Sequence, residues 1–372
     1  MTAPATAVNR YLYLDGVLER VCVDVQLTSA QYEDATKKYG SIGRWLADPS
    51  SPLWKYAPDI YPQGSMRLGT TIRPWRGEEF DLDVVCQLNG CGGQPASDVY
   101  ELVAHRLGDH GTYRLLLEPK DRCLRINYAG DFHLDIIPAC PVSADAIKVP
   151  DRKLAAWVPS NPIGYAEWFF ERCQYRKLLE KRAFDASISP LPSQVPAEYK
   201  YPLQRAVQLL KRHRDSFFDG NPNAARSILL TTLAAQVYDG EQSLTLTLDG
   251  IIDGIRAFIA RVRGIPQVPN PTNRLENFAA GWNAETYPQF VRYVQSLRQH
   301  LDRLMAGNGI DETTKSLGGF VGKPLAERAV LEKARETEQL RNKRALRVEP
   351  STGTLLAGAA GIAIPRNNFY GS

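Results

Sequence analysis

Three aspartates in apolar, strand-like stretches are the residues of this chain best suited to chemistry. Asp81 and Asp83 stand two apart in FDLDVVCQL, and Asp135 lies in the middle of FHLDIIP. Because alternate residues of a strand point to one face, Asp81 and Asp83 share a face of the sheet. Two carboxylates this close repel each other unless a cation lies between them, which favours a hard divalent ion such as Mg²⁺, with Mn²⁺ as an alternative.

The third acid decides between a metal site and a chance pair. Asp-x-Asp pairs occur on many exposed strands without a ligand, but an unpaired charge such as Asp135 is costly in an apolar strand. Three acids in buried strands therefore favour a two-metal site. Such a site activates an attacking hydroxyl and stabilises a leaving phosphate.

The dipeptide Gly64-Ser65 precedes the acidic strand in YPQGSMRLG. Its glycine permits close approach of a phosphate, and the Ser65 hydroxyl and neighbouring amides donate hydrogen bonds to phosphate oxygens. An ordinary helix-to-strand turn would explain the glycine but not the acids that follow it. Arg67, Arg73 and Arg76 are either triphosphate ligands or solvated charges, and we expect at least two of them to be solvated.

The elements that must position these residues are mixed in the first half of the chain. Thr28 and Gln31 form a capping-box pattern, which predicts a helix over residues 28–46. Strands are predicted over FDLDVVCQL, CLRINY and FHLDIIPA, with a hairpin-like turn at 129–131 between the last two. A further helix is predicted over SDVYELVAHRLGDH. These patterns predict strands that carry acids, with helices between them.

From about residue 163 onward, apolar residues recur at helical spacing instead. Two stripes have this spacing: Leu203, Val207, Leu210 and Phe217, and then Phe290, Val294, Leu297, Leu301 and Leu304. Asn270-Pro271 predicts another helix start, and its apolar stripe comprises Leu275, Phe278 and Trp282. A charged helix is predicted over about 325–346, and the Gly/Ala-rich end is predicted to be a flexible tail.

The overall composition indicates a globular protein of ordinary charge. The chain has 372 residues, a net charge of +4 and a pI near 8.6, which suits a phosphate-bearing ligand but not a dedicated nucleic-acid binder. We expect no signal peptide and no membrane span. The six scattered cysteines lack zinc-site spacing, so we expect reduced thiols, no structural zinc and a cytoplasmic protein.

The motifs resemble the polymerase-β-type nucleotidyltransferase superfamily, whose signature is a Gly-Ser turn, an Asp-x-Asp strand and a third Asp on a neighbouring strand. More narrowly, the chain resembles the bacterial CD-NTases, which are relatives of cyclic GMP–AMP synthase that make signals for CBASS anti-phage defence. This closer match rests on QGSMRLGTTIRP, EFDLDVV, LQRAVQLLKRHRD, ARSILLTTLAA and VPNPTNRLENFAAGW, which span residues 60–285.

The resemblance implies an α+β fold with a polymerase-β-like nucleotidyltransferase core, a mixed sheet with helices, and a helical second domain. The implied boundaries are 1–162 for the core with its N-terminal brace helix, 163–347 for the helical domain and 348–372 for a flexible tail. The active site is expected in the cleft between the two domains. Its product would be a cyclic di- or trinucleotide made from nucleoside triphosphates, with ATP as the first candidate and GTP or others as alternatives.

The resemblance also assigns roles to residues. Asp81, Asp83 and Asp135 would hold two Mg²⁺ ions, and Asp135 would help to deprotonate the attacking ribose hydroxyl. The donor triphosphate would be bound by the following residues: Gln63, Gly64, Ser65, Lys211 and Ser227. From the residues alone, Lys211 is equally well a surface lysine of the basic run KRHR. The set Asn270, Glu276, Asn277 and Trp282 is expected to be structural.

The C-terminal sequence NNFYGS resembles CD-NTase tails that are gripped by, and conjugated through, a ubiquitin-transferase-like E1–E2 partner. In this chain the residues concerned would be Phe369, Tyr370 and Gly371, although Ser372 follows the glycine. A disordered end is the alternative. The absence of a zinc insertion argues against direct sensing of double-stranded DNA.

Two competing functions remain at this point. The same chemistry with another acceptor would make the chain a toxin-like enzyme that nucleotidylates tRNA or a protein, but the modest charge disfavours it. A catalytically inactive nucleotide-binding scaffold is the other alternative. The intact aspartate triad disfavours the scaffold, because a binding module has no need of three mutually repelling acids.

Overall fold

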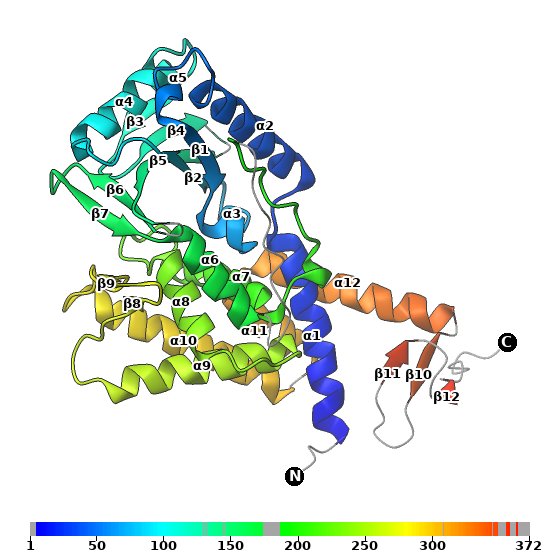
Figure 1. Cartoon of the computed structure of the whole chain (residues 1–372). Coiled ribbons are helices and arrows are strands. Elements are labelled where there is room, and N and C mark those ends of the chain that lie inside the picture. The colour runs from blue at the N-terminus through cyan, green and yellow to red at the C-terminus, as the bar shows by residue number, and fades with distance from the viewer. Residues whose placement is uncertain are drawn as a thin grey trace.

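A seven-stranded mixed sheet forms the framework of the first lobe in the computed structural model (Figure 1). The structure describes residues 5–128, 130, 132–143, 146–173, 187–307, 309–343, 345–348, 355–357 and 362–363. The sheet order is β1-β2-β5-β4-β3, and β6 pairs with β5 and β7. The strands are β1 (Pro58–Pro62), β2 (Phe80–Leu88), β3 (Leu117–Pro119), β4 (Leu124–Tyr128), β5 (Phe132–Pro141), β6 (Ile147–Asp151) and β7 (Ala156–Ser160). The three strands predicted from the sequence are therefore present as β2, β4 and β5.

Strand β2 separates its apolar and acidic residues onto opposite faces. Leu82 and Val84 are fully buried in the core beneath α2 (Ser29–Leu46) and α4 (Ala96–Gly108), whereas Asp81 is exposed and Asp83 half-buried. Strands β2 and β5 are parallel neighbours, while β4 and β5 form the predicted antiparallel pair.

The capping box of Thr28 and Gln31 is present at the start of α2. Short helices α3 (Gly64–Leu68) and α5 (Tyr113–Leu116) and 3₁₀ turns at Trp54–Tyr56 and Ala197–Tyr199 complete the connections.

The second lobe is helical, as expected, but it also includes the N-terminal helix, which was expected to brace the core over residues 1–162 (Figure 1). Its helices are α1 (Ala5–Val25), α6 (Pro162–Cys173), α7 (Pro202–Phe218), α8 (Ser227–Val237), α9 (Leu244–Arg261), α10 (Thr286–Ala306), α11 (Ile310–Val321) and α12 (Lys323–Asn342). In α1, Leu14, Val17 and Val21 lie on one face and are buried in the core of this lobe. The lobe is thus built from both ends of the chain.

The helix predicted at Asn270-Pro271 is wrong. This segment is a small hairpin of β8 (Pro269–Asn270) and β9 (Asn273–Asn277), in which Leu275 is 88% exposed. The Asn270 side chain accepts a hydrogen bond from the Thr272 amide at 3.0 Å. An Asn-Pro pair favours such a turn over a helix start, because the Asn side chain bonds its own backbone two residues on.

The cysteines, the membrane span and the C-terminal tail were the subjects of three further expectations. Cys91 and Cys140 form a disulfide, with Cα atoms 5.8 Å apart, so the expectation of six reduced thiols is wrong for this pair. Among the described helices, none is long and apolar enough to cross a bilayer. The segment after α12 contains short strands β10 (Leu346–Val348), β11 (Leu355–Ala357) and β12 (Ile362–Ala363), and the predicted partner residues Phe369, Tyr370 and Gly371 lie outside the described residues.

Candidate active site

Strand pairing brings the three predicted aspartates to one wall of the cleft. In the parallel ladder of β2 and β5, Asp83 is directly opposite Asp135, and Asp81 is opposite His133. The register therefore fixes the spacing of the acids through backbone hydrogen bonds. Asp135 is 8% exposed, while the side chain of Asp81 is 55% exposed at the mouth of the cleft.

Arg125 of β4 is a site residue that the sequence analysis missed. Its Nε and Nη2 donate to the two carboxylate oxygens of Asp135 at 2.7 and 2.8 Å, and Nη2 also reaches Asp81 Oδ1 at 3.2 Å. This fork explains how Asp135 is tolerated in an apolar strand. The sequence does contain an indication of this role. Arg125 is a charged residue within the apolar stretch CLRINY, and this predicted strand precedes the one that carries Asp135.

Asp83 differs from Asp135 in its surroundings. Within the described part of the chain, its carboxylate accepts no hydrogen bond, and its surroundings raise its pKa to about 7. Loss of solvation is the largest cause, followed by the charges of Asp135 and Asp81. A carboxylate in this position is stabilised in its charged form by a cation, so Asp83 marks where positive charge is needed.

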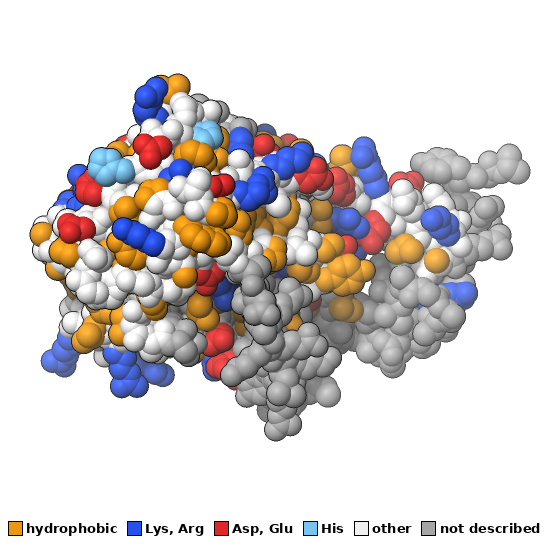
Figure 2. Space-filling model, turned by 45° about the horizontal axis from the view of Figure 1, so that its top comes forward, with side chains coloured by type: hydrophobic (Ala, Val, Ile, Leu, Met, Phe, Trp, Pro, Cys, Tyr) orange, Lys and Arg blue, Asp and Glu red, His pale blue; other side chains and the backbone are white. Residues whose placement is uncertain are grey.

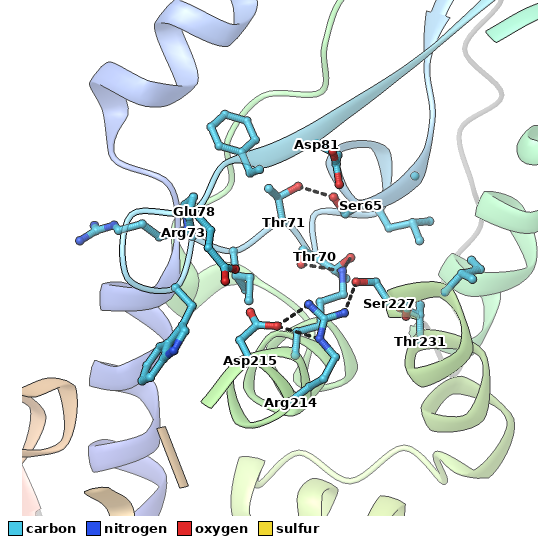
Figure 3. Close-up of a pocket in the computed structure, with 18 of the residues that line it drawn as sticks. Ser65, Thr70, Thr71, Arg73, Glu78, Asp81, Arg214, Asp215, Ser227 and Thr231 are labelled. Atoms are coloured by element: carbon cyan, nitrogen blue, oxygen red, sulfur yellow. Dashed lines mark hydrogen bonds and ion pairs between the residues drawn. The ribbon is translucent and has the colours of Figure 1, made fainter. Parts of the chain in front are cut away.

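The predicted phosphate turn lies against Asp83. Gly64 has a φ of +62°, and a Cβ built on it would overlap Asp83 Oδ2, so glycine is required for both conformation and space. Gln63 is the N-cap of α3, and its amide donates to the Asp83 carbonyl at 2.9 Å. Ser65 Oγ is 2.9 Å from Thr71 Oγ1 (Figure 3).

Lys211 of α7 is part of the site and is not a surface lysine. It is 3% exposed, and its Nζ donates to the carbonyl and the hydroxyl of Thr70 at 3.1 and 3.2 Å. Burial, followed by the charge of Arg214, lowers its pKa to about 7, although the acids Asp215 and Asp83 oppose this shift. Lys211 is therefore a cation with neutral protein partners, which leaves its charge available to an anion.

Ser227 is the first residue of α8 and faces the same cleft (Figure 3). Its Oγ accepts a hydrogen bond from Arg214 Nη1 at 2.6 Å, and Arg214 Nε donates to Asp215 Oδ1 at 2.7 Å. The Arg214–Asp215 pair was not singled out from the sequence, because the run KRHRD shows no preference for one cation over another.

A cavity of about 240 Å³ lies between these groups. Its walls are α3, the loop that follows it, β2, α7 and α8, and Asp81, Asp83, Ser65, Lys211 and Ser227 all line it. Figure 3 shows Asp81 on one side of it and Arg214 and Ser227 on the other. The structure thus brings Asp81 and Asp83 to one space with the predicted phosphate-binding residues Gly64, Ser65, Lys211 and Ser227. Asp135, paired with Asp83 on β5, is not among the described residues that line this cavity, and Gln63 lines the adjoining one.

A second cavity of about 280 Å³ adjoins the first. Gly64 and Asp83 line both cavities, and the far side of the second is formed by Tyr165 of α6 and Glu276 of β9. Gly64 and Asp83 therefore have room for a ligand on each side. Glu276 was expected to be structural, and its carboxylate does accept a hydrogen bond from Asn270 Nδ2 at 2.8 Å.

The three arginines near the turn differ in exposure. Arg76 is exposed and pairs with Asp219 at 2.8 Å, as expected of a solvated charge. Arg73 and Arg67 are half-buried, and they line the first and second cavities respectively. The expectation that at least two of the three are solvated is therefore wrong.

The three aspartates on the sheet side of the cleft offer the kind of donor atoms that bind a divalent metal ion. Asp81, Asp83 and Asp135 supply the carboxylate oxygens that Mg²⁺ prefers, and the pKa of Asp83 is raised even though the charges of Lys211 and Arg125 oppose this shift. In the described residues no three His, Cys, Asp or Glu side chains gather as closely as a metal centre requires, and Arg125 lies between Asp81 and Asp135. The residues fit Mg²⁺ in chemistry, and a bound ion would have to share Asp81 and Asp135 with Arg125.

Comparison with known proteins identifies the family. A family model of the Second Messenger Oligonucleotide or Dinucleotide Synthetase domain matches residues 14–172. The c-di-GMP synthase of Roseivirga ehrenbergii is 34% identical over 377 residues, which cover 98% of each chain. The chain belongs to this synthetase family. It is a nucleotidyltransferase that makes nucleotide second messengers from nucleoside triphosphates, so the predicted family, enzyme class and general function are confirmed.

Other members of the synthetase family show the same fold. The cyclic dinucleotide synthase CdnG of Bradyrhizobium diazoefficiens is 25% identical over 85% of this chain and 82% of its own length. A structure of CdnG in complex with GTP matches with a TM-score of 0.70, covering 86% of this chain and 98% of that chain at 23% identity. Vibrio cholerae DncV, a cyclic AMP-GMP synthase, matches with a TM-score of 0.53 at 13% identity, over 82% of this chain and 94% of that chain. The predicted α+β fold is confirmed.

Proposed function

We propose that this synthetase makes a cyclic dinucleotide from two molecules of GTP in the cleft between its lobes. The proposal rests on the full-length similarity to a c-di-GMP synthase and on two adjoining cavities that share Gly64 and Asp83. One cavity would hold the donor nucleotide and the other the acceptor. Of the nucleotides considered from the sequence, GTP thus replaces ATP as the first candidate.

The residues divide the reaction between them. The donor triphosphate would lie in the first cavity, bound by the Gly64-Ser65 turn, Lys211 and Ser227. Asp135, oriented by Arg125, would accept the proton of the attacking ribose hydroxyl. The hydroxyl oxygen forms a bond to the α-phosphorus of the donor, the bond to the β-phosphate oxygen breaks, and pyrophosphate leaves. A second transfer of the same kind closes the ring.

Asp81, Asp83 and Asp135 would hold the Mg²⁺ ions. When bound, such ions activate the hydroxyl and neutralise charge on the leaving phosphates. The role of the protein is to fix the carboxylates by strand register and to keep the phosphate turn within reach of them.

The distribution of charge supports a small acceptor over tRNA or protein. Figure 2 shows cationic and acidic side chains interspersed over the described part of one face, without a broad basic surface there. A nucleic-acid acceptor favours a continuous basic patch. Use of the product in anti-phage signalling and conjugation of the tail to an E1–E2 partner stay predictions from the resemblance.

The deciding experiment is identification of the product by mass spectrometry. The full chain would be incubated with Mg²⁺ and GTP alone, ATP alone, or all four ribonucleoside triphosphates, beside an Asp81→Asn/Asp83→Asn control. We expect cyclic di-GMP from GTP alone and no product from the control. A product that requires ATP would overturn the choice of GTP, and transfer of labelled nucleotide to added tRNA or protein would overturn the small acceptor.

A further inference from the structure

Asp81 is the least buried of the three aspartates, so its surroundings restrict its side chain less than those of the other two. Its side chain is 55% exposed, whereas Asp135 is buried and the Asp83 carboxylate lies against Gly64. An exposed side chain can exchange between rotamers, and only some rotamers of Asp81 point toward Asp83 and the cleft. The direction of this carboxylate therefore depends on the groups that contact it.

Two polar side chains reach the Asp81 carboxylate in the part of the chain that the structure describes. Arg125 Nη2 donates to Asp81 Oδ1 at 3.2 Å, but the same guanidinium is also bound to both carboxylate oxygens of Asp135. His133 Nδ1 lies 3.5 Å from the same Asp81 oxygen. His133 is opposite Asp81 in the ladder of β2 and β5, so backbone pairing brings its ring to Asp81.

A further carboxylate holds the other side of the His133 ring. His133 Nε2 pairs with Oε2 of Glu79, the residue before β2, and Glu79 Oε1 accepts a hydrogen bond from the Gly130 amide at 2.7 Å. The side chains of Glu79 and His133 are both about three-quarters buried. Because each oxygen of Glu79 has its own donor, the carboxylate cannot turn without losing a contact. The turn between β4 and β5 thus fixes Glu79, and Glu79 fixes the ring.

The contact with Glu79 decides what the His133 ring can offer to the aspartate side. Nε2 carries a hydrogen, because an ionised carboxylate can only accept. Nδ1 donates to Asp81 if it also carries a hydrogen, and otherwise accepts from Arg125 Nη1, which lies 3.4 Å away. In both forms the ring lies between the same neighbours, so it restricts Asp81 whether or not it is charged.

We infer that Glu79 and His133 are positioning residues, which keep the Asp81 carboxylate turned toward the metal ions of the cleft. The inference rests on the proposed binding of Mg²⁺ by the aspartates. A bound ion would have to share Asp81 with Arg125, and His133 is then the protein contact of Asp81 that does not compete for Asp135. Neither Glu79 nor His133 touches the reacting atoms. Groups that orient a metal ligand in this way typically change metal affinity or activity by about 10- to 100-fold when they are removed.

The first test is the affinity of the full chain for Mn²⁺ alone, measured by the loss of the free-ion signal in electron paramagnetic resonance. The informative variant is Glu79→Gln, because an amide has one acceptor oxygen for two donors, the Gly130 amide and His133 Nε2. We expect its affinity for Mn²⁺ to be at least about tenfold lower than that of the wild type. The control is Glu101→Gln, at an exposed acid of α4. Equal affinity in Glu79→Gln and the wild type would overturn the inference.

A variant without the acids separates this inference from the proposed function. We expect Asp81→Asn/Asp83→Asn to lose the Mn²⁺ binding of the wild type. If this variant binds Mn²⁺ as the wild type does, the proposed metal site fails, and the inference fails with it. If the double variant loses binding while Glu79→Gln keeps it, the inference alone fails.

A second substitution tests whether Glu79 acts through the ring, and it also serves if Glu79→Gln does not fold. His133→Phe keeps a ring but has no polar atom, and His105→Phe is the control at an exposed histidine of α4. We expect His133→Phe to weaken Mn²⁺ binding as Glu79→Gln does, and the combination to be no weaker than His133→Phe, because residues in one chain of contacts are not additive. His133→Asn, whose amide can replace Nδ1, should recover part of the affinity. Losses that add in the combination would overturn the chain of contacts.

Kinetics and stability distinguish a positioning role from a structural one. In Glu79→Gln, the Mg²⁺ concentration for half-maximal rate should rise about tenfold, while the KM for GTP at saturating Mg²⁺ changes by less than about threefold. A pair that only stabilises the fold would lower the melting temperature in EDTA and leave the Mg²⁺ dependence of the rate unchanged, which would overturn the inference. This arm needs the proposed use of GTP and the Mn²⁺ arm does not. An enzyme inactive with GTP would therefore fail the proposed substrate, and Mn²⁺ binding would still decide the inference.

Discussion

The two walls of the cleft hold their charges by different means. On the sheet wall, backbone pairing of β2 and β5 places Asp83 opposite Asp135. On the helix wall, a single long side chain, Lys211, reaches from α7 to the carbonyl of Thr70. The first arrangement is rigid because it depends on a ladder of hydrogen bonds, and the second depends on how closely a helix approaches a loop.

Burial shifts the charges of both walls toward neutrality. The pKa of Asp83 is raised to about 7, and that of Lys211 is lowered to about 7. In the proposed reaction, a metal–nucleotide complex would bring positive charge to the sheet wall and negative charge to the helix wall. We therefore expect a bound substrate to stabilise the charged forms of both Asp83 and Lys211.

The sheet wall should be the more sensitive to substitution. Asp83→Asn removes a charge at the point where both cavities meet, and we expect the rate of product formation to fall roughly a thousandfold, equivalent to about 4 kcal/mol on the barrier. Product formation would be measured by mass spectrometry at saturating GTP and Mg²⁺. Asp121→Asn, a change at an acid that pairs with exposed Lys153, is the control. A loss of less than tenfold would remove Asp83 from the reacting centre.

Gly64→Ala tests the contact between the phosphate turn and the sheet wall. The added methyl would overlap Asp83 Oδ2 at a positive φ, so the turn must shift, and a displacement of about 1 Å is expected to lower activity about a hundredfold. Gly92→Ala is the control, because a Cβ built on Gly92 would meet no atom within 4 Å. If both variants have equal kcat, the close approach at Gly64 has no role in catalysis.

Lys211→Met tests the helix wall. Loss of one charge-assisted contact to phosphate should raise the KM for GTP at least about tenfold, with a smaller change in kcat. Steady-state kinetics would separate the two parameters, and Lys153→Met, a change at an exposed lysine, is the control. A change confined to kcat would instead place Lys211 in the chemical step.

The pH dependence of stability should distinguish the walls by its sign. Because the folded pKa of Asp83 lies above its usual 3.8, the folded state retains a proton that the unfolded state loses, so stability falls as pH rises from about 4 to 7. The folded pKa of Lys211 lies below its usual 10.5, so its contribution to stability rises as pH rises from about 7 to 10.5. We expect shifts of several degrees in melting temperature, measured in EDTA without nucleotide.

Two variants test which residue causes each change of stability with pH. Asp83→Asn should flatten the decline between pH 4 and 7, and Lys211→Met should flatten the rise above pH 7. The reverse assignment, or parallel curves for wild type and variants, would mean that neither group is buried as the structure has it.

Much of the sheet wall was predictable from the sequence. Alternation along FDLDVVCQL placed Asp81 and Asp83 on one face. The close approach of a phosphate to Gly64 stays a prediction, and what the structure shows at this glycine is the close approach of Asp83. The hairpin at Asn270 was mistaken for a helix. Apolar residues that stand three and four positions apart also occur by chance in a turn and the segment that follows it. The periodicity of α1 was overlooked.

Strand alternation is a local property, so the amino-acid sequence was enough to place the three acids in strands and to put Asp81 and Asp83 on one side of theirs. The packing of distant elements settled that Arg125 pairs with Asp135 and that Lys211 reaches Thr70 across 141 residues. These outcomes depend on which side chains meet when distant elements pack. A basic run such as KRHR gives each of its cations the same local pattern, so packing alone selects the one that enters the cleft.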